Sequence, residues 1–128
     1  LVTAPLPAAT ATALREGVQA GGTVLWVVGS PAAATSLGEL IQSPGLTATE
    51  SSPGSFALMT DVALQHPLFA PFADPRFGDF SRIRIWKHRA LPTNALGNAR
   101  ILARLDSGSP AMLEVPVGRG RVIVWTFG

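Results

Sequence analysis

Ser30 is the residue whose position most resembles that of a catalytic nucleophile. It lies in the segment Val-Gly-Ser-Pro-Ala at residues 28–32, directly after an apolar stretch typical of a strand. A serine at such a strand-to-helix turn can present its hydroxyl at the top of a sheet. Here the second glycine of the G-x-S-x-G pattern is missing, and Pro31 removes an N–H that would help to form an oxyanion hole. We therefore predict that Ser30 caps the following helix, with anion binding at that helix N-terminus as the alternative.

The two histidines could act as general bases or metal ligands. His66 precedes a proline in a phenylalanine-rich segment, and His88 lies between Lys87 and Arg89. No carboxylate stands at a spacing that would orient either imidazole in a hydrolytic triad, so a hydrolase using Ser30 with a histidine is only an alternative. We predict that His66 is structural and bonds the backbone of its own irregular loop. Two distant histidines and scattered acids are too few ligands for a metal, so neither a metal nor a cofactor is expected.

Acidic and glycine-rich segments indicate turns rather than sites. The four aspartates and four glutamates do not pair along the sequence, and Asp61, Asp74 and Asp79 border turns where their side chains can bond the nearby backbone. The segment Gly118-Arg119-Gly120 lies between two strand patterns without a helix behind it. It therefore predicts a hairpin turn and not a phosphate-binding loop.

The composition excludes several classes of site and partner. The absence of cysteine excludes disulfides, thiolate metal sites and cysteine nucleophiles. No apolar run approaches the roughly 20 residues of a membrane-spanning helix, and no signal-peptide pattern is present. Nine of the ten basic residues lie between Arg76 and Arg121. We interpret them as protection of strand edges and expect no nucleic-acid partner, because the aromatic residues form no stacking platform.

Hydrophobic periodicity predicts two helices and a series of strands. Residues 9–20 and 32–42 have helical spacing, the first ending at Gly21 and the second following Ser30 and Pro31. Residues 23–28 are apolar on both faces, which is typical of a strand covered on both sides in a parallel sheet. Further strands are expected at residues 56–59, 82–89, 100–105, 111–115 and 121–127, with turns at 106–109 and 117–120, an exposed loop at 43–55, and an irregular aromatic segment at 66–80 packed over the sheet edge.

These elements predict one α/β domain spanning residues 1–128. We expect a three-layer mixed sheet, flavodoxin-like in its first half and ending in antiparallel strands. An exposed edge position for residues 23–28 would contradict this prediction. The residues expected to be mostly buried are Val24, Leu25, Val27, Leu102, Leu105, Val122, Ile123 and Val124.

The helix, the Gly21-Gly22 pair, the strand and the turn together resemble the part of class I glutamine amidotransferase domains that carries the catalytic cysteine. In this alignment Val28 or Gly29 takes the place of the cysteine, and Trp26 takes the place of a small glycine. The catalytic His and Glu that follow a late strand in that family have no match either. The resemblance therefore implies an amidotransferase-like domain without its catalytic residues.

A second resemblance covers most of the chain. Its segments are residues 21–23, 66–69, 101–105 with Gly108 and residues 110–111, and 117–122, in that order. They are similar to the amidotransferase-like domain of bacterial Bat-type (aerotolerance) membrane proteins, which combine membrane helices, a von Willebrand A-like domain and this domain. The resemblance implies a soluble domain of a membrane protein, on an unspecified side of the membrane, that serves as a non-catalytic interaction or scaffolding module. Its expected partners are other protein domains of the same or an associated envelope complex.

A small-ligand or carbohydrate site is the remaining alternative to the interaction domain. Such a site would lie at the carboxyl ends of the parallel strands beside Gly29 and Ser30, with Trp86 and His66 as further candidate contacts. Residues 1–3 are expected to be the carboxyl end of a strand that precedes the first helix. We also expect the native protein to extend in both directions, with membrane segments outside this chain, and the isolated chain to self-associate through an exposed sheet edge.

Overall fold

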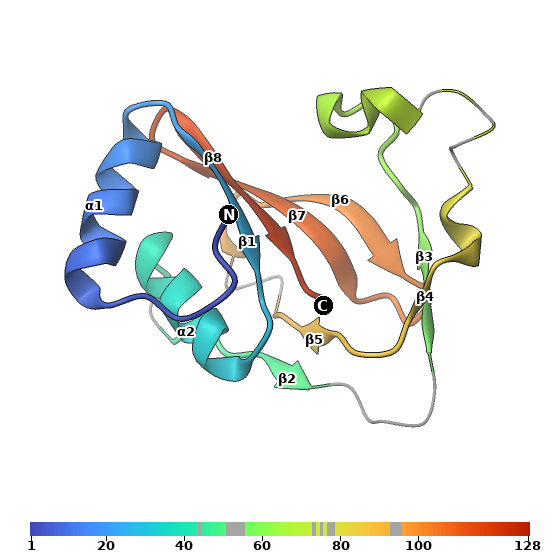
Figure 1. Cartoon of the computed structure of the whole chain (residues 1–128), viewed down its shortest axis with the longest axis horizontal. Coiled ribbons are helices and arrows are strands. Elements are labelled where there is room, and N and C mark those ends of the chain that lie inside the picture. Colours follow the sequence, from blue (N-terminus) through green and yellow to red (C-terminus); the bar gives the residue numbers. More distant parts are fainter. Residues whose placement is uncertain (44, 51–55, 73, 75, 77–78, 93–95) are drawn as a thin grey trace.

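The computed structural model describes residues 1–43, 45–50, 56–72, 74, 76, 79–92 and 96–128, and its main feature is a curled six-stranded sheet (Figure 1). The strands lie in the order β1-β8-β7-β6-β3-β4. Their bounds are Thr23–Val27 (β1), Ala57–Thr60 (β3), Arg84–Ile85 (β4), Arg100–Leu105 (β6), Pro110–Val117 (β7) and Gly120–Trp125 (β8). The other described elements are the separate strand pair Thr49–Glu50 (β2) and Arg89–Ala90 (β5), the α-helices Ala8–Gln19 (α1) and Pro31–Leu40 (α2), and the 3₁₀-helices Pro67–Phe72 (η1) and Phe80–Arg82 (η2).

The predicted three-layer, flavodoxin-like α/β fold is wrong. Only β1 and β8 pair in parallel, and the other four strand pairs of the main sheet are antiparallel. Antiparallel neighbours are joined by short turns, so the second half of the chain needs no crossover helices. Both described α-helices lie on the same face of the sheet, as Figure 1 shows. The protein is therefore mostly β, with both described α-helices on one face of the sheet and the 3₁₀-helix η1 against the other.

The ends of both helices follow the predicted local signals. After α1, the N–H of Gly21 donates to Val18 and the N–H of Gly22 donates to Gly17, and Gly21 has a φ of +123°. This is the arrangement that a glycine at the end of a helix permits. At the start of α2 the Ser30 hydroxyl oxygen accepts a hydrogen bond from the N–H of Ala33 at 3.2 Å. The predicted helix cap at Ser30 is confirmed.

Strand β1 lies at the edge of the sheet, the position that the predicted fold excluded for residues 23–28. Beyond it, among the described residues, only Val2 adds to the ladder: its N–H donates to Leu25 and its carbonyl accepts from Val27, both at 2.8 Å. These two hydrogen bonds form a parallel bridge between Val2 and Trp26. The bridge lies where the sequence predicted the carboxyl end of a strand at residues 1–3.

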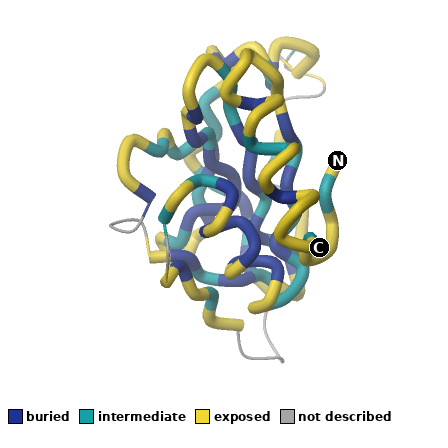
Figure 2. Tube along the Cα trace, turned by 90° about the vertical axis from the view of Figure 1, so that its left-hand side faces the viewer, coloured by how far each residue is buried: buried dark blue, intermediate teal, exposed yellow. Residues whose placement is uncertain are grey.

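Two apolar clusters form the core, one on each face of the sheet. The first joins α1 and α2 to Trp26, Val122 and Val124, and the second joins β3 and β6 to Phe69 of η1. Figure 2 shows the buried stretches running along the strands, with exposed residues on the outer turns of the helices. Six of the eight predicted core residues are buried. Leu25 and Val27 are only partly buried, because they face the side opposite α1 and α2.

The chain between η1 and β6 departs most from the prediction. Of the strand expected at residues 82–89, only Arg84–Ile85 pairs with β3, and Ile83 is 43% exposed whereas Ile85 is buried. The loop expected to be exposed at residues 43–55 buries Leu46 in the first core cluster. Residues 44 and 51–55 of that loop, like parts of the aromatic segment 66–80, lie outside the described residues.

Candidate functional site

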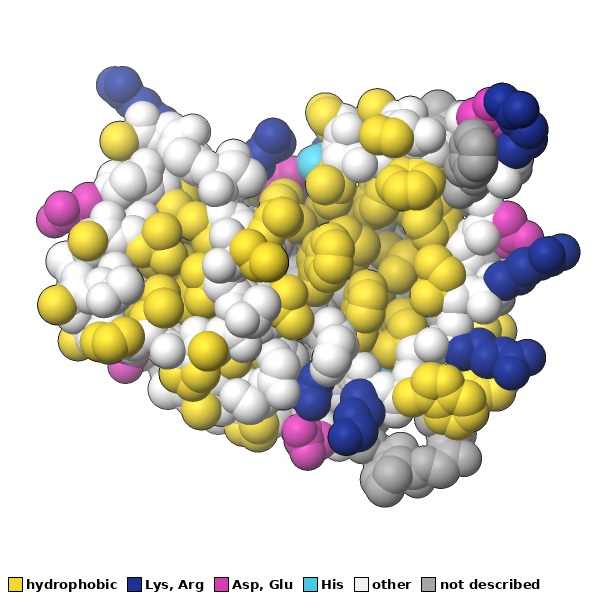
Figure 3. Space-filling view, viewed as in Figure 1, with side chains coloured by type: hydrophobic (Ala, Val, Ile, Leu, Met, Phe, Trp, Pro, Cys, Tyr) yellow, Lys and Arg dark blue, Asp and Glu magenta, His cyan; other side chains and the backbone are white. Residues whose placement is uncertain are grey.

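The face of β1 and β8 opposite α1 and α2 carries several partly exposed apolar side chains. Alternate residues of both strands point to this side, and the register pairs Leu25 with Ile123 and Val27 with Trp125. We call Leu25, Val27, Trp125 and Phe127 the open face, since each of these apolar side chains is only partly buried. The rings of Trp125 and Phe127 stack, with centroids 5.9 Å apart and planes 10° apart. Figure 3 shows hydrophobic side chains gathered over the middle of the molecule, with charged side chains along its margins.

A polar cluster of His66, Glu114 and Arg121 adjoins the open face. His66 is 4% exposed, and its Nδ1 accepts a hydrogen bond from the N–H of Leu68 at 3.1 Å. The ring proton therefore lies on Nε2, which donates to Oε2 of Glu114. Arg121 Nη1 lies 3.6 Å from the same carboxylate oxygen. The predicted bond from His66 to its own loop is present, and the ring also ties that loop to β7.

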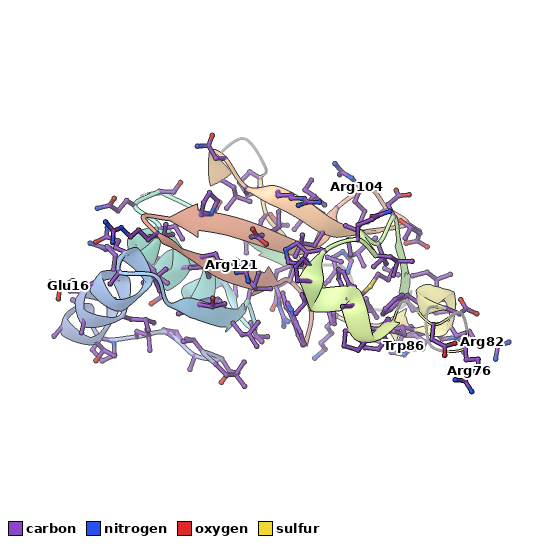
Figure 4. The ribbon with its side chains drawn as sticks, turned by 90° about the horizontal axis from the view of Figure 1, so that it is seen from above. Glu16, Arg76, Arg82, Trp86, Arg104 and Arg121 are labelled. Atoms are coloured by element: carbon purple, nitrogen blue, oxygen red, sulfur yellow. The ribbon has the colours of Figure 1, made fainter. Side chains whose placement is uncertain are left out.

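Two adjoining cavities flank Arg121, which lies at the start of β8 beside Thr23 of β1 and is labelled in Figure 4. The larger, of about 440 Å³, is mostly polar and is bounded by residues 118–121, Thr23 and Glu114. The smaller, of about 340 Å³, is mostly apolar and is bounded by His66, Leu68, Leu25 and Ile123. Both cavities include Thr23 and Arg121 in their walls, and we call the two together the groove around Arg121, with a charged half and an apolar half.

The structure does not bring the four predicted ligand-binding residues together. Gly29 and Ser30 follow β1 at one edge of the sheet. Trp86 follows β4 at the opposite edge, where it is 58% exposed and packs edge-on against Phe56 (Figure 4). His66 contacts β7, between those edges. Glu114 and Arg121 were not predicted as site residues from the sequence. The signal that could have indicated them is the lone glutamate in an otherwise apolar strand.

In the described part of the chain, no contact supports a catalytic arrangement of Ser30 with a histidine or a metal site. The only hydrogen bond of the Ser30 side chain there is the helix cap, and both nitrogens of His66 are engaged elsewhere. No group of three or more potential metal-ligating side chains occurs among the described residues. None of the described helices is both long and apolar enough to cross a membrane.

Comparison with known proteins identifies similar folds but no family. No protein-family model and no curated protein matches the sequence. The structure is similar to that of the cytoplasmic protein STM1381 from Salmonella typhimurium LT2, with a TM-score of 0.67 and 16% identity over 92% of this chain and 49% of that one. The cytoplasmic protein STM3548 from Salmonella typhimurium is similar with a TM-score of 0.65 and 14% identity, over 91% of this chain and 48% of that one. The exo-β-1,4-mannosidase Op5Man5 from Opitutaceae bacterium strain TAV5 is similar with a TM-score of 0.60 and 17% identity, over 99% of this chain and 20% of that one.

At these identities the likeness concerns the fold alone. The chain spans about half the length of the two Salmonella proteins and a fifth of the mannosidase. The two Salmonella proteins are described as cytoplasmic, so the expected context of a membrane protein has no counterpart in them. None of the three descriptions mentions an amidotransferase-like or Bat-type domain, and that resemblance stays a prediction from the sequence.

Proposed function

We propose that this chain is a non-catalytic interaction domain that binds a partner protein through its open face. The observation that carries the proposal is the incomplete cover of the second side of β1 and β8, whose sequences are mostly apolar on both faces. Strands with this pattern are typical of sheets covered on both sides. In the described structure α1 and α2 cover one side, and Leu25, Val27, Trp125 and Phe127 remain partly exposed on the other.

The composition of the open face favours a protein partner. Clustered aromatic and aliphatic side chains at a surface mark sites of association, and burying them releases about 25 cal/mol for each Å² of apolar surface. Tryptophan and phenylalanine are also enriched at the centres of protein interfaces. Because Trp125 and Phe127 already stack on each other, their rings lose little rotational freedom when a partner covers them.

In the similar Salmonella proteins this fold is part of a longer chain. This chain matches only about half of each Salmonella protein, so in both of them the fold occurs together with a comparable length of further chain. For the present protein the partner is then another protein domain, of the same or of a different polypeptide. Its placement in a membrane protein of the cell envelope rests on the sequence resemblance alone.

Site-specific photo-cross-linking in cells tests this proposal. The photoreactive amino acid p-benzoylphenylalanine replaces Phe127 on the open face or, as a control, Glu16 on the exposed surface of α1. We expect discrete protein adducts at position 127 that are absent at position 16. The proposal is wrong if position 127 gives no protein adduct, or if both positions give the same adducts.

A further inference from the structure

We propose that the groove around Arg121 binds a small amphipathic carboxylate, with the carboxylate on Arg121 and the apolar part in the adjoining cavity. The inference goes beyond the proposed function, because it assigns a ligand class to a cavity at the Thr23 end of the sheet. It rests on three properties of the groove: unused hydrogen-bond donors, net charge, and the division into a charged and an apolar half.

The Arg121 guanidinium keeps its hydrogen-bond donors for a ligand. Among the described residues it has one ion pair, to Glu114 at 3.6 Å, and its side chain makes no hydrogen bond. Glu114 accepts its hydrogen bond from the imidazole of His66 instead. Because Arg121 is 43% exposed in the wall of both cavities, its N–H groups can reach a bound molecule. A planar guanidinium matches the two oxygens of a carboxylate in a bidentate pair.

The charge of the groove favours an anion over a cation. Arg119 and Arg121 contribute two positive charges to its polar half, against the single carboxylate of Glu114. Thr23, at the boundary between the two halves, adds a hydroxyl that can donate to the ligand.

The apolar half of the groove determines which chemical group the ligand carries beside its carboxylate. Leu25, Leu68 and Ile123 line a cavity of about 340 Å³ directly beside Arg121. This volume lies in the usual range for small-molecule sites, whose walls are mostly apolar with a few polar groups that fix orientation. The fitting ligand therefore carries an aliphatic or aromatic group within a few bonds of its carboxylate. Such chemistry occurs in free carboxylic acids and at the carboxyl terminus of a peptide that ends in an apolar residue.

An NMR-monitored titration of the isotope-labelled chain tests the inference. The probes are 3-phenylpropionate and the peptide Gly-Gly-Phe, each compared with its uncharged amide. We expect saturable binding of at least one carboxylate, with shifts at Thr23 and Arg121, and binding at least about tenfold weaker for the matching amide. Binding of only one of the two carboxylates identifies the source of the ligand. The inference is overturned if neither carboxylate binds or if the amides bind equally well.

Two arginine variants complete the test. Arg121→Gln should weaken carboxylate binding about tenfold or more, because it removes the guanidinium. Arg82→Gln is the matched control, since it removes the same charge from an exposed residue at the far end of the molecule (Figure 4). If Arg121→Gln unfolds the chain, Arg121→Lys replaces it and should bind more weakly than the wild type, since lysine lacks the planar fork. Unchanged affinity in the folded Arg121 variant overturns the inference, whatever the result of cross-linking at position 127.

Discussion

The imidazole of His66 joins two segments that are 48 residues apart in the sequence. On one side it fixes the turn into η1 by accepting from the N–H of Leu68, and on the other its Nε2–H donates to the carboxylate of Glu114. A buried ring with both nitrogens engaged positions its neighbours, and this role agrees with the structural role predicted from the sequence. The partner on β7 could not be predicted, because it depends on the path of the irregular loop across the sheet.

His66→Leu should lower the free energy of unfolding by about 1–3 kcal/mol, because it leaves the N–H of Leu68 and the carboxylate of Glu114 without their partner. Urea denaturation measures the loss. Gln65→Leu is the control at the exposed neighbouring position and should change stability by less than about 0.5 kcal/mol. Equal stability of the two variants would show that the ring does not join the two segments.

His88 makes stability depend on pH. Burial lowers the pKa of its imidazole from the ordinary 6.5, and the neighbouring Arg89 charge lowers it further, against a smaller opposing effect of Asp106. As the pH falls through about 6.5, the unfolded chain binds a proton more readily than the folded one, so folding stability should decrease below that pH. At higher pH the His88 ring is neutral in both the folded and the unfolded chain, so it causes no loss of stability there.

His88→Gln removes this titration. Urea unfolding at about pH 7.5 and about pH 5.5 should show a smaller loss of stability on acidification for the variant than for the wild type. The same acid-induced loss in both proteins would show that His88 does not contribute to it.

At the scale of elements, the β7–β8 turn packs directly against the end of α1. A Cβ atom added at Gly120 would lie 2.1 Å from the carbonyl oxygens of both Val18 and Gly22. Gly118, in the same turn, has a φ of +58° and lies close to Gln19. The glycines that resemble a phosphate-binding motif in the sequence therefore serve close backbone packing between a hairpin and a helix.

Gly120→Ala should destabilise the chain by about 1–3 kcal/mol or more, because no flexible side chain can move away from the added methyl group. Gly17→Ala is the matched control within α1, where nothing lies near the added atom. It should stabilise the protein by about 0.5–1 kcal/mol through helix propensity. Thermal unfolding of both variants checks the prediction, and a tolerated Gly120→Ala would contradict the close packing.

Elements fixed by local signals were predicted well, and those fixed by distant contacts were not. The caps at Ser30 and Gly21 and the two hairpins of β6, β7 and β8 depend on residues next to them in the sequence. In contrast, the alternation at residues 82–89 suggested a long strand, but only two of these residues pair with β3. A pattern shows which face could be buried, whereas the length of a strand depends on the partner beside it.

At the scale of the whole molecule, one feature of the sequence led to the wrong fold class and also underlies the proposed function: the apolar pattern of residues 23–28. The apolar pattern of residues 23–28 correctly indicated a strand, and the prediction placed it in a parallel sheet with helices of this chain on both faces, which is wrong. In the described structure the helices cover one face, and the other bears the open face. Under the proposed function this incompletely covered surface is where a partner binds, and the sequence of this chain alone could not identify that partner.

Because the chain contains no cysteine, a single introduced cysteine can test most directly whether a partner covers the open face. Val27→Cys places a thiol there with little change in volume, and Glu16→Cys places one on the exposed surface of α1 as the control. The maleimide labelling rate is measured for the purified chain and for the protein in freshly lysed cells that produce it from its native gene. The proposal predicts that labelling at position 27 is several-fold slower in the lysate, with no change at position 16. Equal rates at position 27 in both samples would contradict it.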